Sequence, residues 1–157
     1  MFADDEIFNI VFLKAQLSTM EDVTGRCDFA TDGEIAVSLV RKSLERYLDE
    51  CDSEGRGAKG CLYSLLVLDY SMPNLEGPEV ARKVTEAYEE YRLKLIEKRP
   101  MQFGEEDRIL PLPAMVCLTG FQDTSYQDTA TKNGFIEFLV KPVALETLKR
   151  LTQEYAK

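Results

Sequence analysis

The sequence predicts an α/β fold in which a doubly wound parallel sheet of five strands carries helices on both faces. Short apolar stretches alternate with longer segments whose apolar residues recur every three or four positions, the pattern of strands alternating with amphipathic helices. The stretch at residues 62–68 is almost entirely apolar, as in a strand buried on both faces of a parallel sheet. No internal repeat interrupts this order, so we expect one domain over residues 1–157.

The first expected strand is short, because only residues 1–3 precede the acidic pair Asp4-Asp5. Either the chain begins inside a longer protein or this strand is stunted. A helix rich in apolar residues follows at 7–17, and we expect it to be largely buried. Glu6 is expected to belong to a solvated acidic helix start, which the helix dipole favours.

The remaining elements follow from the same periodicities. Strands are expected at residues 26–30, 62–68, 114–118 and 136–140. Helices are expected at residues 35–48, 78–95, 124–132 and 145–155. The turn residues Thr31-Asp32-Gly33 supply an N-cap for the second helix.

Two segments depart from this alternation and are predicted to be insertions. Residues 49–60 are polar and contain three glycines. Residues 99–113 contain three prolines and the acidic cluster Glu105-Glu106-Asp107. Both compositions disfavour regular structure, so we expect irregular surface loops.

Composition excludes several classes of function. Twenty-eight acidic residues against nineteen basic ones leave a net charge of −9, which would repel a polyanion, so no nucleic-acid partner is expected. No apolar stretch is long enough to cross a bilayer and no signal peptide is recognisable, so we expect a cytoplasmic protein without membrane insertion. The four cysteines are too scattered for a disulfide scaffold or a typical zinc site and are interpreted mainly as core thiols. The chain has no histidine, which excludes Ser-His-Asp triads, Cys-His dyads and His-ligated zinc.

Polar residues stand where the predicted strands end. Asp4 and Asp5 follow the first strand, Asp69 the third, Thr119 the fourth and Lys141 the fifth. Ligands bind at this edge of a doubly wound sheet. Three carboxylates would repel one another unless a cation lies among them, and Mg²⁺ favours such oxygen ligands together with a phosphate. One carboxylate could then attack phosphorus to form an aspartyl phosphate, with a charge from Lys141 and a hydrogen bond from Thr119.

In this order, these residues resemble the receiver domains of response regulators in two-component signalling. The matching motifs are Asp4-Asp5 with Asn9, Ala30-Thr31-Asp32-Gly33-Glu34, Leu68-Asp69-Tyr70-Ser71-Met72-Pro73 with Gly77, Leu118-Thr119-Gly120 and Lys141-Pro142. The resemblance covers almost the whole chain and is greatest to receivers of hybrid histidine kinases. It implies a flavodoxin-like sheet with the strand order 2-1-3-4-5.

The resemblance also implies roles for the residues at the strand ends. Asp69 would be the phosphoacceptor, loaded from a phosphohistidine of a histidine kinase or a histidine phosphotransfer protein. The cofactor Mg²⁺ would be bound by Asp5, Asp69 and the backbone carbonyl of Ser71, with Asp4 acting largely through water. Such a domain is not an enzyme toward other substrates and catalyses only its own Mg²⁺-dependent phosphorylation and dephosphorylation. Without a histidine, the chain can only receive the phosphoryl group.

The resemblance further implies a switch. After phosphorylation the Thr119 hydroxyl would move inward, and Phe138 would turn into the vacated space and change the surface near the fourth and fifth strands. Many relatives carry a tyrosine at that aromatic position, whereas the two rotamers of Phe138 can differ only in packing. The Lys141-Pro142 peptide bond is expected to be cis and to direct the lysine toward the phosphoryl group.

Two other functions remain open. The first is a pseudo-receiver that binds proteins without being phosphorylated, which the short first strand favours. The second is a Mg²⁺-dependent phosphatase resembling haloacid dehalogenases, although these have a second acid two positions after the nucleophile, where Ser71 stands. The chain is expected to be either a free-standing receiver or part of a larger hybrid kinase.

Overall fold

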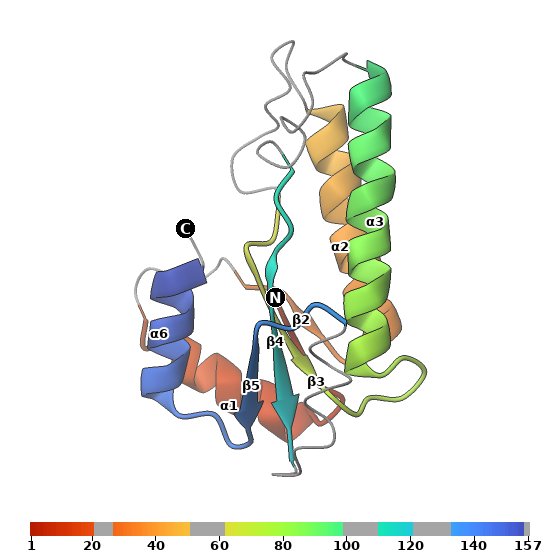
Figure 1. The fold of residues 1–157 in the computed structure, drawn as a ribbon. Coiled ribbons are helices and arrows are strands. Elements are labelled where there is room, and N and C mark those ends of the chain that lie inside the picture. Colours follow the sequence, from red (N-terminus) through yellow and green to blue (C-terminus); the bar gives the residue numbers. More distant parts are fainter. Residues whose placement is uncertain (21–26, 51–61, 99–109, 121–132, 156–157) are drawn as a thin grey trace.

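The structure of the protein is a computed structural model, which describes residues 1–20, 27–50, 62–98, 110–120 and 133–155. Its elements are β1 (Phe2–Ala3), α1 (Ile7–Leu17), β2 (Phe29–Ala30), α2 (Gly33–Asp49), β3 (Leu65–Asp69), α3 (Gly77–Lys98), β4 (Ala114–Thr119), β5 (Glu137–Val140) and α6 (Leu145–Tyr155). The five strands form one parallel sheet in the order β2-β1-β3-β4-β5 (Figure 1). The predicted fold class and strand order are confirmed.

Helices cover both faces of the sheet, with α2 and α3 on one side and α1 and α6 on the other (Figure 1). All five residues of β3 are buried. Leu66 and Leu68 join the core under α2 and α3, whereas Leu65 and Val67 join the core under α1 and α6. This alternation explains the nearly continuous apolar run, since a strand between two helical layers needs apolar side chains on both faces.

The strand β1 is as short as the sequence predicts. Phe2 and Ala3 pair with β2 on one side and with β3 on the other. Backbone hydrogen bonds continue the pairing at both ends, where the carbonyl of Met1 accepts from the Val67 amide and the Asp4 amide donates to Ala30. The short strand therefore still brings Asp4 to the edge of the sheet.

Several element boundaries differ from the prediction. The strand predicted at 62–68 begins at Leu65, and Tyr63 instead donates a hydrogen bond to the Asp28 carboxylate at 2.5 Å. The helix predicted to start at Pro78 starts at Gly77 and continues to Lys98. The predicted N-cap is confirmed, because the Asp32 side chain accepts from the Ile35 amide at 2.8 Å.

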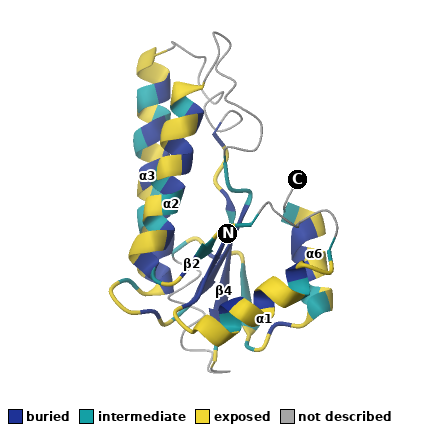
Figure 2. Ribbon diagram, turned by 180° about the vertical axis from the view of Figure 1, so that it is seen from behind, coloured by how far each residue is buried: buried dark blue, intermediate teal, exposed yellow. Residues whose placement is uncertain are grey.

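The prediction that α1 is largely buried is wrong. Its buried side chains are Ile10, Leu13 and Leu17. Four large apolar side chains point to solvent instead, namely Ile7 (69% exposed), Phe8 (88%), Val11 (57%) and Phe12 (49%). Figure 2 shows this exposed side of the helix in yellow. We call these four residues the α1 apolar face.

Some of the remaining predictions concern residues that the structure does not describe, and others can be compared with it. The helix at 124–132, the acidic cluster of Glu105-Glu106-Asp107, and Cys51 and Cys61 lie outside the described residues. The end of the second predicted insertion is not idle surface, because Leu110 is buried in the core and its carbonyl accepts two hydrogen bonds from Arg92. Cys117 is a buried free thiol, as expected, whereas Cys27 is only partly buried. In the described part of the chain, no helix is both long and apolar enough to cross a membrane.

Candidate functional site

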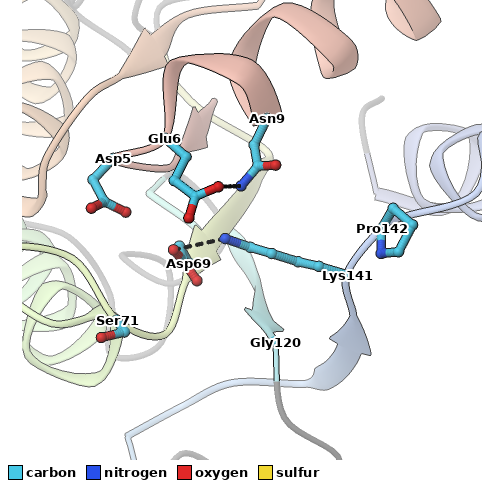
Figure 3. Close-up of a pocket in the computed structure, with 8 residues that line it drawn as sticks. All are labelled: Asp5, Glu6, Asn9, Asp69, Ser71, Gly120, Lys141 and Pro142. Carbon is cyan, nitrogen blue, oxygen red and sulfur yellow. Dashed lines mark hydrogen bonds and ion pairs between the residues drawn. The ribbon is translucent and has the colours of Figure 1, made fainter.

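A polar pocket opens at the carboxyl edge of the sheet, where the sequence predicts the site (Figure 3). The residues that line it lie at or just after the ends of β1, β3, β4 and β5 and include three acids and one lysine. They are Asp5, Glu6, Asn9, Asp69, Ser71, Gly120, Lys141 and Pro142. The strands β1, β3, β4 and β5 run parallel, so the segments that follow them meet at this edge.

Three carboxylates meet in this pocket. Ala3 pairs with Leu68 in the sheet, so the next residues, Asp4 and Asp69, lie beside each other. Asp4, Asp5 and Asp69 each offer a carboxylate oxygen within 4.8 Å of the other two. Asp4 and Asp69 are buried and Asp5 is exposed, so the cluster reaches from the sheet to solvent.

Lys141 bridges the two buried carboxylates. Its Nζ lies 2.7 Å from an oxygen of Asp4 and 2.8 Å from an oxygen of Asp69. Burial raises the pKa of the Asp69 carboxyl, and the hydrogen bond from Lys141 offsets only part of that effect. Burial opposes the charge of Lys141, but the hydrogen bonds to Asp4 and Asp69 prevail and raise the pKa of its ammonium group. One lysine thus serves two carboxylates, and the pocket retains excess negative charge.

The start of α1 holds Asp4 in place. The Asn9 amide donates to both carboxylate oxygens of Asp4, at 3.0 and 3.1 Å, and the backbone amide of Glu6 donates to Asp4 Oδ1 at 3.0 Å. The expectation that Glu6 is only a solvated helix start is incomplete. Its side chain is exposed but lines the pocket and accepts a hydrogen bond from Asn9 at 3.3 Å.

The residues predicted to act in the switch lie next to the pocket. Thr119 ends β4, one residue before the pocket residue Gly120, and its carbonyl accepts from the Lys141 amide at 2.9 Å. Phe138 is partly buried in β5 and packs against Phe135, with ring centroids 6.0 Å apart. The Lys141-Pro142 bond is cis, as expected. Ser71 lines the pocket, and its backbone amide favours the charged form of Asp69 and so lowers the pKa of that carboxyl, against the larger effect of burial.

Comparisons with known proteins agree with this geometry, although no family model matches the chain. The chain is 32% identical over 102 residues to the two-component response regulator ARR7 of Arabidopsis thaliana, a match that covers 63% of this chain and 40% of the relative. The chain therefore has the fold of response-regulator receiver domains and is similar in sequence to one response regulator. The match spans less than half of that relative.

Solved receiver-domain structures share the fold over nearly the whole chain at low sequence identity. A mutant receiver domain of the histidine kinase CKI1 from Arabidopsis thaliana has a TM-score of 0.66 at 13% identity, covering 98% of this chain and 88% of that one. The receiver domain of Ssk1 from Saccharomyces cerevisiae, solved with the histidine phosphotransfer protein Ypd1, has a TM-score of 0.63 at 20% identity, covering 99% and 86%. The receiver domain of the sensor histidine kinase PA1611 from Pseudomonas aeruginosa, with a magnesium ion in its active-site cleft, has a TM-score of 0.56 at 18% identity, covering 98% and 93%.

The donor set of this pocket fits a hard divalent cation. Asp5 and Asp69 present carboxylate oxygens, which Mg²⁺ prefers to nitrogen or sulfur. Asp5 is exposed, and among the described residues no group was found to donate to its carboxylate. Its oxygens can therefore bind an ion without first breaking a contact within that part of the chain.

Sequence reasoning missed one glycine, Gly77, as a determinant of the site. A Cβ at Gly77 would lie 2.4 Å from the backbone carbonyl oxygen of Asp69. The Gly77 amide also donates to the Tyr70 carbonyl at 2.9 Å, which closes the loop after β3. Gly77 was recognised only as part of a motif, because its contact joins residues eight positions apart through a turn that periodicity does not describe.

Proposed function

We propose that the chain is a response-regulator receiver domain and acts as a phosphoacceptor in phosphorelay signalling. A carboxylate oxygen of Asp69 attacks the phosphorus of a phosphohistidine, so that a P–O bond forms as the P–N bond breaks and the imidazole leaves. The observation that carries the proposal is the meeting of Asp69 with Lys141 at 2.8 Å and with Asp5 in one open pocket. This arrangement supplies a nucleophile, a fixed positive charge and a place for a cation, which phosphoryl transfer requires.

Magnesium is the cofactor that we propose for this site. Asp5, Asp69 and the backbone carbonyl of Ser71 would bind it directly, and Asp4 would act largely through water. When bound, the ion neutralises charge on the transferring phosphoryl group. The proposal is supported by the carboxylate cluster and by the magnesium ion in the cleft of the Pseudomonas receiver domain.

The switch that follows phosphorylation is proposed to use Thr119 and Phe138. Thr119 stands at the end of β4, and Phe138 is only partly buried in the adjacent strand β5. An inward shift of the hydroxyl would allow the ring to turn and would alter the surface near these strands. We place this signalling in the cytoplasm, since Cys117 is a buried free thiol, as is usual in a reducing compartment.

The decisive experiment is intact-mass analysis after incubation with a small phosphodonor, with and without Mg²⁺. Wild type is expected to gain the mass of one phosphoryl group only when Mg²⁺ is present, and Asp69→Asn is expected to gain none. Circular dichroism on both proteins establishes that they are folded. A folded wild type without an adduct would refute the phosphoacceptor function and favour a pseudo-receiver that binds partners without being phosphorylated, a role that the two-residue strand β1 would suit.

Metal binding has its own prediction. At ten times its dissociation constant, Mg²⁺ should raise the melting temperature of wild type by about 3–6 °C, because a ligand that binds only the folded state stabilises it. Asp5→Asn should reduce this shift by more than half, since it removes the exposed ligand. The control is Asp49→Asn, which removes an exposed acid at the end of α2. Equal shifts in all three proteins would remove Asp5 from the metal site.

The protein that donates the phosphoryl group is proposed to dock on the α1 apolar face. This face begins in the helical turn that also presents Glu6 and Asn9 to the pocket, so a donor whose histidine reaches Asp69 has to approach over it. Phe8 is 88% exposed, more than is usual for a large apolar side chain without a partner. The co-crystal structure of the Ssk1 receiver with a phosphotransfer protein supports a partner of this class.

Replacing both Phe8 and Val11 with serine should slow transfer from a phosphohistidine protein by about tenfold or more, since burying two apolar side chains stabilises a complex by about 2–4 kcal/mol. Phosphorylation by a small phosphodonor should be unchanged, because these side chains do not line the pocket. The matched control is Leu93→Ser, at an exposed leucine of α3. Equal slowing with both donors, or with the control, would contradict docking on α1.

A further inference from the structure

The carboxylate of Asp4 is fully engaged by other groups. It is 1% exposed. Its Oδ1 accepts from the Glu6 amide and from Asn9, and its Oδ2 accepts from Asn9 and from the Lys141 ammonium. A carboxylate offers about four lone-pair directions, and these four contacts occupy them in this structure. The carboxylate of Asp4 therefore orients Glu6, Asn9 and Lys141 through hydrogen bonds and does not bind an additional ligand directly.

Asn9 supplies two of these four contacts, and its orientation is determined by its surroundings. Its Nδ2 faces both oxygens of Asp4, at 3.0 and 3.1 Å, and the Oε2 of Glu6 at 3.3 Å. A flipped amide would place its oxygen against three carboxylate oxygens, which would repel it. Only the donating side of the amide is compatible with this position.

The neutrality of Asn9 suits a site that must also attract a cation. A lysine or arginine at position 9 could satisfy the same oxygens, but it would add a second fixed positive charge beside Lys141 and weaken the field that attracts a divalent ion. An aspartate would add another negative charge and could not donate when ionised. An amide donates twice without changing the charge of the pocket.

Lys141 depends on this arrangement because it is shared between two carboxylates. Its Nζ lies 2.7 Å from Asp4 and 2.8 Å from Asp69. The terminal torsion of an aspartate is soft, so without Asn9 the Asp4 carboxylate could rotate and move Oδ2 away from the ammonium. Lys141 would then lose one of its two anchors.

We infer that Asn9 is a positioning residue, which locks the Asp4 carboxylate and thereby holds Lys141 at a set place beside Asp69. Asn9 acts through Asp4 and does not itself touch the reacting atoms. The consequence for phosphoryl transfer rests on the proposed function, but the position of the lysine does not.

The test observes the Lys141 ammonium directly by nitrogen-detected NMR, with the signal assigned through its absence in Lys141→Arg. In wild type we expect a slowly exchanging Nζ signal, because two carboxylates hold the group and shield it from water. In Asn9→Ala this signal should broaden or disappear while the amide spectrum of the sheet is retained. Phosphorylation by a small phosphodonor should slow by about fivefold to tenfold. Glu34→Gln is the control, since it removes an exposed charge from the first turn of α2 and does not change a residue that lines the pocket.

A double-mutant cycle separates positioning from a general effect on the helix. In an Asp4→Asn background, Asn9→Ala should have no further effect on the Lys141 signal or on the phosphorylation rate. An unchanged signal in Asn9→Ala, or effects that simply add in the double variant, would overturn the inference. If Asn9→Ala does not fold, Asn9→Ser, which keeps one shorter donor, is expected to weaken the same signal. If the signal responds as expected but wild type is never phosphorylated, the proposed function fails and the positioning role stands.

Discussion

Replacing Lys141 with methionine is expected to destabilise the metal-free protein and, at the same time, to tighten its binding of Mg²⁺. The methionine keeps an apolar stem of similar length but removes the ammonium that lies between Asp4 and Asp69. Both carboxylates are buried, so they would face each other without a counter-charge. Breaking a buried ion pair in this way costs about 2–4 kcal/mol of unfolding free energy.

The same change should raise the affinity for Mg²⁺ by about tenfold or more. The ammonium occupies an oxygen of Asp69 at 2.8 Å and repels any cation at the carboxylate cluster. Among the described residues that line the pocket, Lys141 is the one cation, so in its absence Mg²⁺ should supply the missing positive charge and restore much of the lost stability. Conformational change after phosphorylation should be strongly reduced, because the lysine is proposed to contact the phosphoryl group.

Denaturant unfolding at several Mg²⁺ concentrations measures both effects. Lys94→Met is the matched control, because Lys94 pairs with Glu90 on the surface of α3, where such a pair contributes little. That variant should change stability by less than about 0.5 kcal/mol and leave Mg²⁺ affinity unaltered. Weaker Mg²⁺ binding by Lys141→Met would show that the lysine supports the metal site rather than competing with the ion.

The substitution Gly77→Ala is expected to destabilise the protein by about 2–4 kcal/mol and to impair the site as well. The added Cβ would lie 2.4 Å from the carbonyl oxygen of Asp69 and 3.2 Å from Tyr70 Cα. These are backbone atoms at the end of the central strand, so they cannot move aside as a flexible side chain would. Relief of the clash has to displace α3 or the end of β3, which carries the proposed phosphoacceptor.

Gly120→Ala is the natural control for this prediction, because a Cβ there meets no atom of the described residues within 4 Å. We expect it to be neutral or to stabilise the fold by up to about 1 kcal/mol, through the lower entropy of the unfolded chain. Thermal unfolding monitored by circular dichroism compares the two variants, and phosphorylation by a small donor compares their sites. If Gly77→Ala melts at the temperature of wild type, the loop after β3 can absorb the side chain and the close approach has no structural role.

The site at the carboxyl edge of the sheet could be predicted largely because the topology of a parallel sheet already brings its residues together, without knowledge of their exact positions. Once strands alternate with helices in a parallel sheet, the residues after each strand have to meet at one edge, as Asp4, Asp69 and Lys141 do. The partners of Asp4 could not be predicted in the same way. Whether the Asn9 amide reaches that carboxylate depends on how the first turn of α1 is set against the end of β1.

Strand boundaries show the same division. The apolar run at 62–68 predicts a buried strand, because a strand that is buried on both faces has apolar side chains at successive positions. Where the strand begins depends on its neighbour, since the ladder between β3 and β4 pairs Leu65 with Ala114. Tyr63 belongs to the apolar run, but it lies before the strand, and its hydroxyl donates a hydrogen bond to the Asp28 carboxylate.

Local periodicity and the rules of parallel sheets are sufficient to predict the order of the elements, the sheet between two helical layers and the edge where the polar residues gather. The buried side of α1, in contrast, depends on packing in the folded protein. That helix has apolar residues around most of its circumference, so its period identifies a helix but not its inner face. Packing against the sheet selected Ile10, Leu13 and Leu17 and left Phe8 in solvent.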